Sequence, residues 1–210
     1  GNRITTEDLY NYQYQIIKKE YFVKLTQRGT FFVGIDNKLG DINKFPTSRV
    51  SYEQEMLTDK YDIANIGAHG SNVSFGIVDN DGWGSMFVDI NYAQTKMIKP
   101  VFLLEHSCNT ASIASNPNLA CEFLYNKFNN VLVFAGATAP QGGMGITTMG
   151  RAVTYEADLL TTGKSIGVAH FASMTLPFIT EPFKSFREAY SAQQILLGDG
   201  TLKLQEFMPH

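Results

Sequence analysis

Cysteine is scarce in this chain, which limits what can hold the fold together. Its 210 residues include only two cysteines, Cys108 and Cys121, too few for the disulfide framework of a small secreted scaffold. They lie 13 positions apart, with no Cys-x-x-Cys pair and no histidine at the spacing of metal ligands. We therefore expect no zinc site and at least one free thiol.

Charged residues and long apolar runs are also few. Charged residues make up 18% of the chain, the net charge is -3, and lysine and arginine are scattered, so we expect no nucleic-acid partner. The longest apolar runs, such as residues 131–136, have the length of a strand, and we expect no membrane span. The N-terminus shows no charged-then-apolar export signal. A hydrophobic share of 44% is typical of a folded domain.

Three apolar runs of strand length organise the middle of the chain. They cover residues 63–67, 101–104 and 131–135 without the alternation of half-exposed strands, which indicates strands covered by helices on both faces. A helix is predicted between the second and third runs, capped by Asn116 with Pro117 at its first position. Strand–helix–strand alternation predicts right-handed crossovers and a mostly parallel sheet, hence an α/β fold. Polar residues after these strands should meet at one rim, where such folds bind ligands.

The other predicted elements complete a single domain of residues 1–210, with a helical extension and a first strand in residues 1–60. Helices are predicted at residues 6–27, 51–59, 89–97, 150–160, 164–174 and 183–197. Strands are predicted at 30–35 and 201–204, a loop at 36–47, and a hairpin between 73–78 and 85–88 around Asn80-Asp81-Gly82.

A histidine and a cysteine follow the first two apolar runs. His69 comes two residues after the first run, and Cys108 comes four residues after the second. A thiol, with a pKa of about 8.5, becomes an effective nucleophile near neutral pH when an imidazole removes its proton. We therefore predict Cys108 as nucleophile and His69 as general base. Gly70 permits close approach of a carbonyl group, so the Gly70 and Cys108 N–H groups are predicted to form the oxyanion hole.

Other residue-level alternatives remain open. A cysteine is most often a small buried hydrophobe, which is our interpretation of Cys121 near Leu124. His106, two positions before Cys108, supports the site, acts as an alternative base, or is a hydrogen-bonded core histidine. Asn109, next to the nucleophile, is a candidate for supporting the site or lining the substrate cleft.

Acidic and aromatic residues after the histidine block are further candidates for a substrate cleft: Asp79, Asp81, Trp83 and Asp89. Acidic groups there would suit a basic substrate side chain. The alternative is a solvated hairpin with a packed tryptophan. A later glycine cluster fits neither the dinucleotide fingerprint nor the P-loop and is interpreted as a loop: Gly142, Gly143 and Gly145.

Two blocks around these candidates resemble the signatures of the caspase-like clan of cysteine peptidases, and within it most closely the gingipain family. They are residues 66–71 (IGAHGS) and 104–110 (LEHSCNT). Three later blocks are also similar to that family: residues 121–137 (CEFLYNKFNNVLVFAGA), 163–167 (GKSIG) and 196–202 (LLGDGTL). The resemblance covers residues 61–204, about two thirds of the chain.

This resemblance implies a caspase-like three-layer αβα sandwich with a mostly parallel central sheet. It also implies a cysteine endopeptidase that hydrolyses peptide or protein substrates through a Cys108 thioester, with His69 as base and without a cofactor or metal. Gingipain-like proteins are typically exported by bacteria, so a secreted or cell-surface location is implied.

Three features depart from the family pattern, and the first, a small difference, is Ala68 between Gly67 and His69. Gly200 stands where a proline is usual, and the region before Tyr61 is short. The acidic residue that supports the histidine in that family comes from this upstream part. Three candidates for it are also explained by an exposed helix face: Glu53, Glu55 and Asp59.

Two competing functions belong to other classes. The first is a catalytically silent caspase-like fold that acts as a peptide- or protein-binding module. The second is a flavodoxin-like nucleotide-binding domain, which rests on sheet topology alone because no strand-end loop offers a phosphate cradle.

Overall fold

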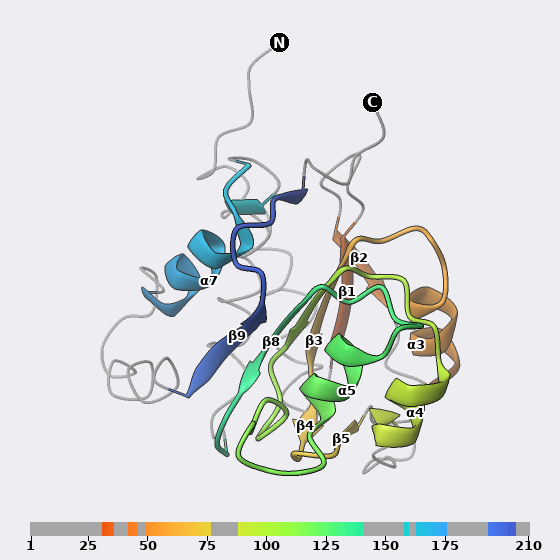
Figure 1. Cartoon of the computed structure of the whole chain (residues 1–210). Coiled ribbons are helices and arrows are strands. Elements are labelled where there is room, and N and C mark those ends of the chain that lie inside the picture. Colours follow the sequence, from red (N-terminus) through yellow and green to blue (C-terminus); the bar gives the residue numbers. More distant parts are fainter. Residues whose placement is uncertain are drawn as a thin grey trace.

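The computed structural model describes residues 31–35, 42–45, 49–76, 88–140, 158–159, 163–175 and 193–204 (Figure 1). The larger of its two sheets has the strand order β2-β1-β3-β7-β8-β9, and the smaller has the order β4-β5-β6. The larger sheet contains β1 (Phe31–Ile35), β2 (Ile42–Phe45), β3 (Ile63–Gly67), β7 (Phe102–Glu105), β8 (Val133–Ala137) and β9 (Gln194–Gly198). The smaller contains β4 (His69–Gly70), β5 (Ser74–Gly76) and β6 (Val88–Asp89).

The centre of the larger sheet is parallel. β7 pairs in parallel with β3 on one side and β8 on the other, while β1 is antiparallel to β2 and β3, and β9 is antiparallel to β8. Thus β2, β3, β7 and β8 run in one direction, and β1 and β9 run in the other. Every residue of β3, β7 and β8 is buried, as expected for their unbroken apolar runs. The predicted α/β class with a mostly parallel sheet is confirmed.

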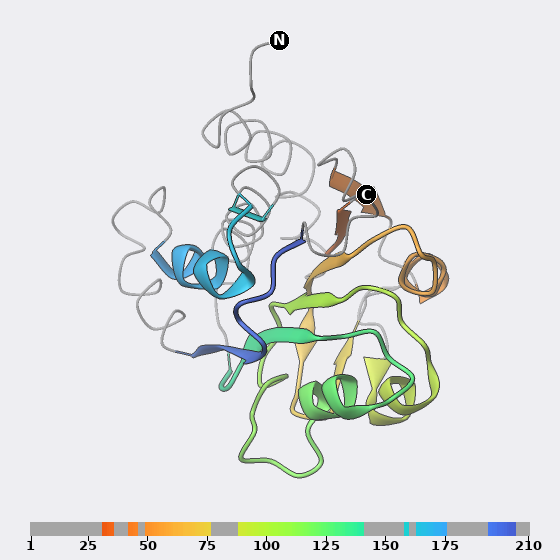
Figure 2. The ribbon, with the colours of Figure 1, turned by 45° about the horizontal axis from the view of Figure 1, so that its top comes forward.

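Helices cover both faces of this sheet. They are α3 (Arg49–Met56), α4 (Ile90–Thr95), α5 (Leu119–Tyr125) and α7 (Ile166–Thr175). The first three pack on one face through a shared core that includes Tyr52, Tyr92, Phe123, Leu103 and Phe134. Figure 2 shows α7 on the other side of β8 and β9 from α5. None of the helices in the described part of the chain has the length and apolar character needed to cross a bilayer.

Local capping explains where two of the helices begin. The Asp89 side chain accepts a hydrogen bond from the Tyr92 N–H (2.7 Å) at the start of α4. At the start of α5 the Asn118 side chain accepts from the Cys121 N–H (3.1 Å). The predicted cap at Asn116 is therefore wrong by two residues, because Asn118 is the one placed to reach the third helical N–H group.

The C-terminal elements differ from the prediction. Residues 194–198 form β9 and not the end of a helix, because their backbone pairs with the outer edge of β8 while Ile195 and Leu197 pack against the core. The predicted strand at 201–204 is also wrong. Asp199 accepts a hydrogen bond from the Thr201 N–H (2.8 Å), which turns the chain, and the Leu202 carbonyl accepts from the Ile166 N–H (2.8 Å) at the start of α7.

The remaining predictions of strands, loops and helices are confirmed only in part. The first strand, predicted at residues 30–35, appears as β1. The predicted loop at 36–47 contains the strand β2. The backbone groups of β2 find hydrogen-bond partners in β1, and the local sequence gives no sign of this pairing. The predicted hairpin appears as the antiparallel pair β5–β6. The predicted helix at 6–27, residues 150–157 and residues 183–192 lie outside the described residues.

Candidate functional site

The ends of β3 and β7 lie side by side at one rim of the sheet. The two strands are parallel, with Ile66 opposite Glu105, and the His106 N–H donates to the Ile66 carbonyl (2.8 Å). His69 follows the end of β3 after one residue, and Cys108 follows the end of β7 after two. The structure therefore brings the two predicted residues to neighbouring strand ends that face the same way.

The segment that carries His69 packs directly on the turn that carries Cys108. A Cβ atom added at Gly70 would lie 2.5 Å from the Ser107 Cβ, 2.9 Å from the Cys108 carbonyl oxygen and 2.9 Å from the Thr110 Cγ2. Two of these three atoms belong to a backbone or lie next to one, so they have little freedom to move aside. Only glycine permits this contact.

The N–H group of Gly70 points away from the small sheet. In the β4–β5 ladder His69 lies opposite Gly76 and Gly70 opposite Phe75, and the Ser71 N–H donates to the Ser74 carbonyl (2.7 Å). Hydrogen-bonded and non-hydrogen-bonded positions alternate in an antiparallel pair. Gly70 therefore occupies a non-hydrogen-bonded position, and its N–H is directed away from β5, as an oxyanion donor requires.

The turn at Cys108 is anchored to the end of β8. The Asn109 N–H donates to the Ala139 carbonyl (3.3 Å), and the Ala111 N–H donates to the Ala137 carbonyl (2.9 Å). Asn109 has a φ of 59°, a left-handed conformation that asparagine tolerates better than most residues. The Cys108 side chain is half-buried and His69 is exposed. Both are therefore accessible from solvent at the rim.

His106 has a different environment. Its side chain is buried, and its Nε2 lies 2.8 Å from the Asn65 Oδ1 of β3. This contact favours the hydrogen-bonded core histidine among the three interpretations of His106. It also joins the ends of β3 and β7 through side chains, in addition to their backbone pairing.

Glu105 is a residue of the site that the sequence interpretation missed. It is fully buried at the end of β7, and its Oε1 accepts a hydrogen bond from the Ser107 hydroxyl. Burial raises the pKa of the Glu105 carboxyl from its ordinary value of 4.5 to about 8, and the hydrogen bond from Ser107 opposes this rise. The sequence did carry a sign of this burial. Glu105 directly follows the apolar run at residues 101–104, so it continues the same buried strand.

Two of the three proposed acidic supports of the histidine pair with basic residues. Glu53 lies 3.4 Å from the Arg49 Nε, and Asp59 lies 3.2 Å from the Lys99 Nζ. Asp59 and Lys99 precede β3 and β7, so their ion pair lies at the amino ends of these strands, opposite the rim that carries His69. Asp59 is therefore not placed to support His69.

The predicted cleft residues are placed only in part. Asp89 caps α4 through its side chain, which is a structural role. Asp79, Asp81, Trp83 and the glycine cluster at 142–145 lie outside the described residues. Among the residues that the structure describes, no group of three or more histidine, cysteine or acidic side chains is arranged to hold a metal ion.

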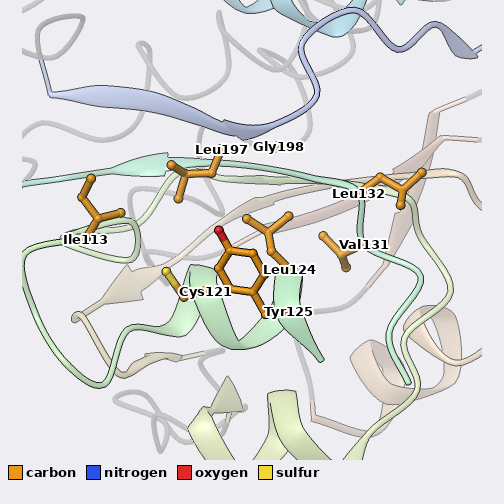
Figure 3. A pocket seen from close by; sticks show the side chains of 8 residues that line it. All are labelled: Ile113, Cys121, Leu124, Tyr125, Val131, Leu132, Leu197 and Gly198. Carbon is orange, nitrogen blue, oxygen red and sulfur yellow. The ribbon is translucent and has the colours of Figure 1, made fainter. Parts of the chain in front are cut away.

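Cys121 lies in a separate place, on α5. Cys108 and Cys121 are not joined in a disulfide. Cys121 is half-buried beside a mainly apolar pocket of about 430 Å³ (Figure 3). The residues that line this pocket come from the loop before α5, from α5, from the segment before β8 and from β9: Ile113, Cys121, Leu124, Tyr125, Val131, Leu132, Leu197 and Gly198. Burial, followed by the charge of Glu122, raises the pKa of the Cys121 thiol, which disfavours its nucleophilic form.

No protein-family model matches the chain, and no curated protein matches it significantly. The resemblance to the gingipain family therefore stays a prediction.

Proposed function

We propose that this chain is a gingipain-like cysteine endopeptidase with a caspase-like αβα sandwich fold. The observation that carries the proposal is the contact between the β4 segment, which bears His69, and the Ser107–Thr110 turn, which bears Cys108. These segments follow adjacent parallel strands, so a general base and a thiol reach the same rim. Helices on both faces of the mixed sheet support the three-layer arrangement.

The proposed reaction begins when Cys108 transfers its proton to His69. Its sulfur then forms a bond with the carbonyl carbon of a peptide bond, and the carbonyl oxygen becomes an oxyanion. The N–H groups of Gly70 and Cys108 donate hydrogen bonds to this oxyanion. When the intermediate collapses, the carbon–nitrogen bond breaks, and His69 returns the proton to the leaving amine. A thioester between the substrate acyl group and Cys108 remains.

Water completes the proposed cycle. His69 accepts a proton from a water molecule, whose oxygen attacks the thioester carbonyl carbon. The carbon–sulfur bond then breaks, the carboxylic product leaves, and the thiol of Cys108 is restored by the proton held on His69. The same two N–H groups stabilise the second oxyanion. The proposed substrate is a peptide or protein, and the resemblance predicts a bacterial enzyme that acts at the cell surface or after secretion.

Hydrolysis of a diverse peptide library tests this proposal. We expect Cys108→Ala and His69→Ala to reduce kcat/KM by at least about a hundredfold, because each removes a group of the covalent step. The matched control is Cys121→Ala, which removes the other thiol and should leave the rate within about threefold of wild type, since Cys121 lies on α5 and not in the Ser107–Thr110 turn. Thermal unfolding of each variant establishes that it is folded.

A catalytically silent binding module is the alternative outcome. It predicts that the folded wild-type chain cleaves no library member while still binding a peptide or protein through the same rim. Hydrolysis that persists in a folded Cys108→Ala variant would also contradict the proposed role of the thiol.

A further inference from the structure

The buried carboxyl group of Glu105 lies beneath the candidate site. Alternation along β7 places Glu105 on the same face as Leu103, which packs in the core under α3, α4 and α5. Burial above all, then the charges of Tyr92, Glu105 and Glu53, raises the pKa of the Tyr52 hydroxyl. Glu105 therefore lies close to Tyr52 of α3, in the interior and not at the surface.

Ser107 connects this carboxyl group to the rim. Its hydroxyl donates to the Glu105 Oε1, and its Cβ is the atom that a Cβ at Gly70 would approach most closely, at 2.5 Å. Its carbonyl accepts from the Thr110 hydroxyl (3.3 Å), which closes the turn around Cys108. The rotamer and backbone position of Ser107 therefore set the spacing between the N–H groups of Gly70 and Cys108.

The environment of Glu105 is unfavourable for a charge. Its second oxygen, Oε2, has no hydrogen-bond partner among the described residues, and no lysine or arginine within that part of the chain forms an ion pair with it. Burial of an uncompensated charge destabilises a fold, and an apolar residue of similar size would fill the space at lower cost. An acid at this position therefore calls for a role beyond packing.

We propose that Glu105 is a positioning residue of the candidate site, whose buried carboxyl group holds Ser107 so that Gly70 and Cys108 keep their spacing. The inference rests on the proposed function, because the residues that Glu105 positions are those of the proposed oxyanion hole. Glu105 itself does not touch the substrate.

The positioning is linked to pH. The groups that face Glu105 are Ser107 from its own loop and Tyr52 from α3, with Glu53 and Tyr92 beyond; Ile66 is its register neighbour on β3. His106 is turned away from it, toward Asn65. Among the described residues, none of these groups carries a positive charge. With a pKa raised by burial to about 8, Glu105 ionises in mildly alkaline solution, and the carboxylate then draws water or shifts, and Ser107 moves with it.

The rate of Cys108 alkylation by iodoacetamide tests the inference without any peptide substrate. The measurement is made in a Cys121→Ser background, so that mass spectrometry follows one thiol. It covers about pH 6 to about pH 10, to include the titration of both the Glu105 carboxyl and a thiol. Glu105→Gln keeps an oxygen acceptor for Ser107 but has no acid to titrate, whereas Glu105→Leu removes the acceptor. We expect the alkylation rate to change with pH in two steps in the chain that keeps Glu105 and in one step in the Glu105→Gln variant. Glu105→Leu and Ser107→Ala should change the neutral rate about fivefold or more, because the turn loses its anchor.

The positioning role would be overturned if the chain with Glu105 and the Glu105→Gln variant had identical pH profiles of alkylation and the rate in Glu105→Leu were unchanged. This holds even if hydrolysis depends on His69 and Cys108. Conversely, a two-step profile in a chain that hydrolyses no peptide would overturn the peptidase proposal and retain Glu105 as a positioning residue of the thiol. If Glu105→Leu does not fold, the comparison with Glu105→Gln decides the question.

Discussion

Ser107 and Gly70 are packed so closely that a Cβ atom on Gly70 would lie 2.5 Å from the Cβ of Ser107. The contact joins the segments that follow two adjacent parallel strands. It places a histidine and a cysteine that are 39 residues apart in the chain at one rim of the sheet.

Gly70→Ala should therefore disable the site. The added methyl group forces the β4 segment away from the Ser107–Thr110 turn, and we expect alkylation or peptide hydrolysis at Cys108 to fall by about tenfold or more. Gly200→Ala is the matched control, because the nearest atom to a Cβ at Gly200 lies 3.5 Å away, an ordinary contact. Equal rates in the two variants would contradict the importance of this contact.

Stability should depend on pH through Glu105. Its pKa in the folded state, about 8, lies above its ordinary value of 4.5, so the folded state holds the proton more tightly than the unfolded state. The free energy of unfolding therefore falls as pH rises from about 4.5 to about 8, by on the order of 3–5 kcal/mol, and levels off above that window.

Urea unfolding of wild type and Glu105→Gln at about pH 5 and about pH 8 measures this dependence. Because glutamine does not titrate, the variant should gain stability relative to wild type as pH rises. The two chains share all other ionisable groups, so the difference isolates Glu105. Parallel stability curves would show that the carboxyl group is not held neutral.

Asn109 should be replaceable by glycine but not by alanine. Its φ of 59° is left-handed, and an alanine there costs about 1–2 kcal/mol, whereas glycine adopts it freely. We expect a lower midpoint of thermal unfolding and slower Cys108 alkylation in Asn109→Ala, with Asn109→Gly close to wild type. The opposite order would indicate that the asparagine side chain itself acts in the site.

The two thiols should differ in reactivity. In a Cys108→Ala chain the remaining thiol, Cys121, should react slowly with iodoacetamide near neutral pH, because burial and the charge of Glu122 raise its pKa. Glu122→Gln removes the charge and should speed the reaction modestly. A Cys121 that reacts as fast as an exposed thiol would contradict this description of α5.

The parts of the fold that could be predicted are those that local sequence encodes. β3, β7 and β8 were recognisable because strands buried on both faces have unbroken apolar runs. Their adjacency followed from the strand–helix alternation, and with it the meeting of the segments that carry His69 and Cys108. The sequence predicts a helix end where β9 lies, because the pairing of β9 with β8 is a long-range contact. The local sequence of residues 194–198 does not indicate this pairing.

Glu105 shows the same limit at the site. Its type and position were visible, but its burial and its bond to Ser107 depend on α3 and on the turn that follows β7. The cap of α5 was displaced from Asn116 to Asn118 because both asparagines suit a cap and only the folded backbone chooses between them. Local pattern locates strand ends, whereas tertiary packing decides which side chains around them are buried.

The most direct test of the account is the site at which a peptidyl chloromethyl ketone attaches to the wild-type chain, mapped by mass spectrometry. We expect a single adduct on Cys108, with Cys121 unmodified, and a labelling rate that falls by about a hundredfold in a folded His69→Ala variant because the thiol loses its base. Labelling of both cysteines at similar rates, or labelling of Cys108 that is unaffected by the loss of His69, would contradict the pairing of the two residues in one site.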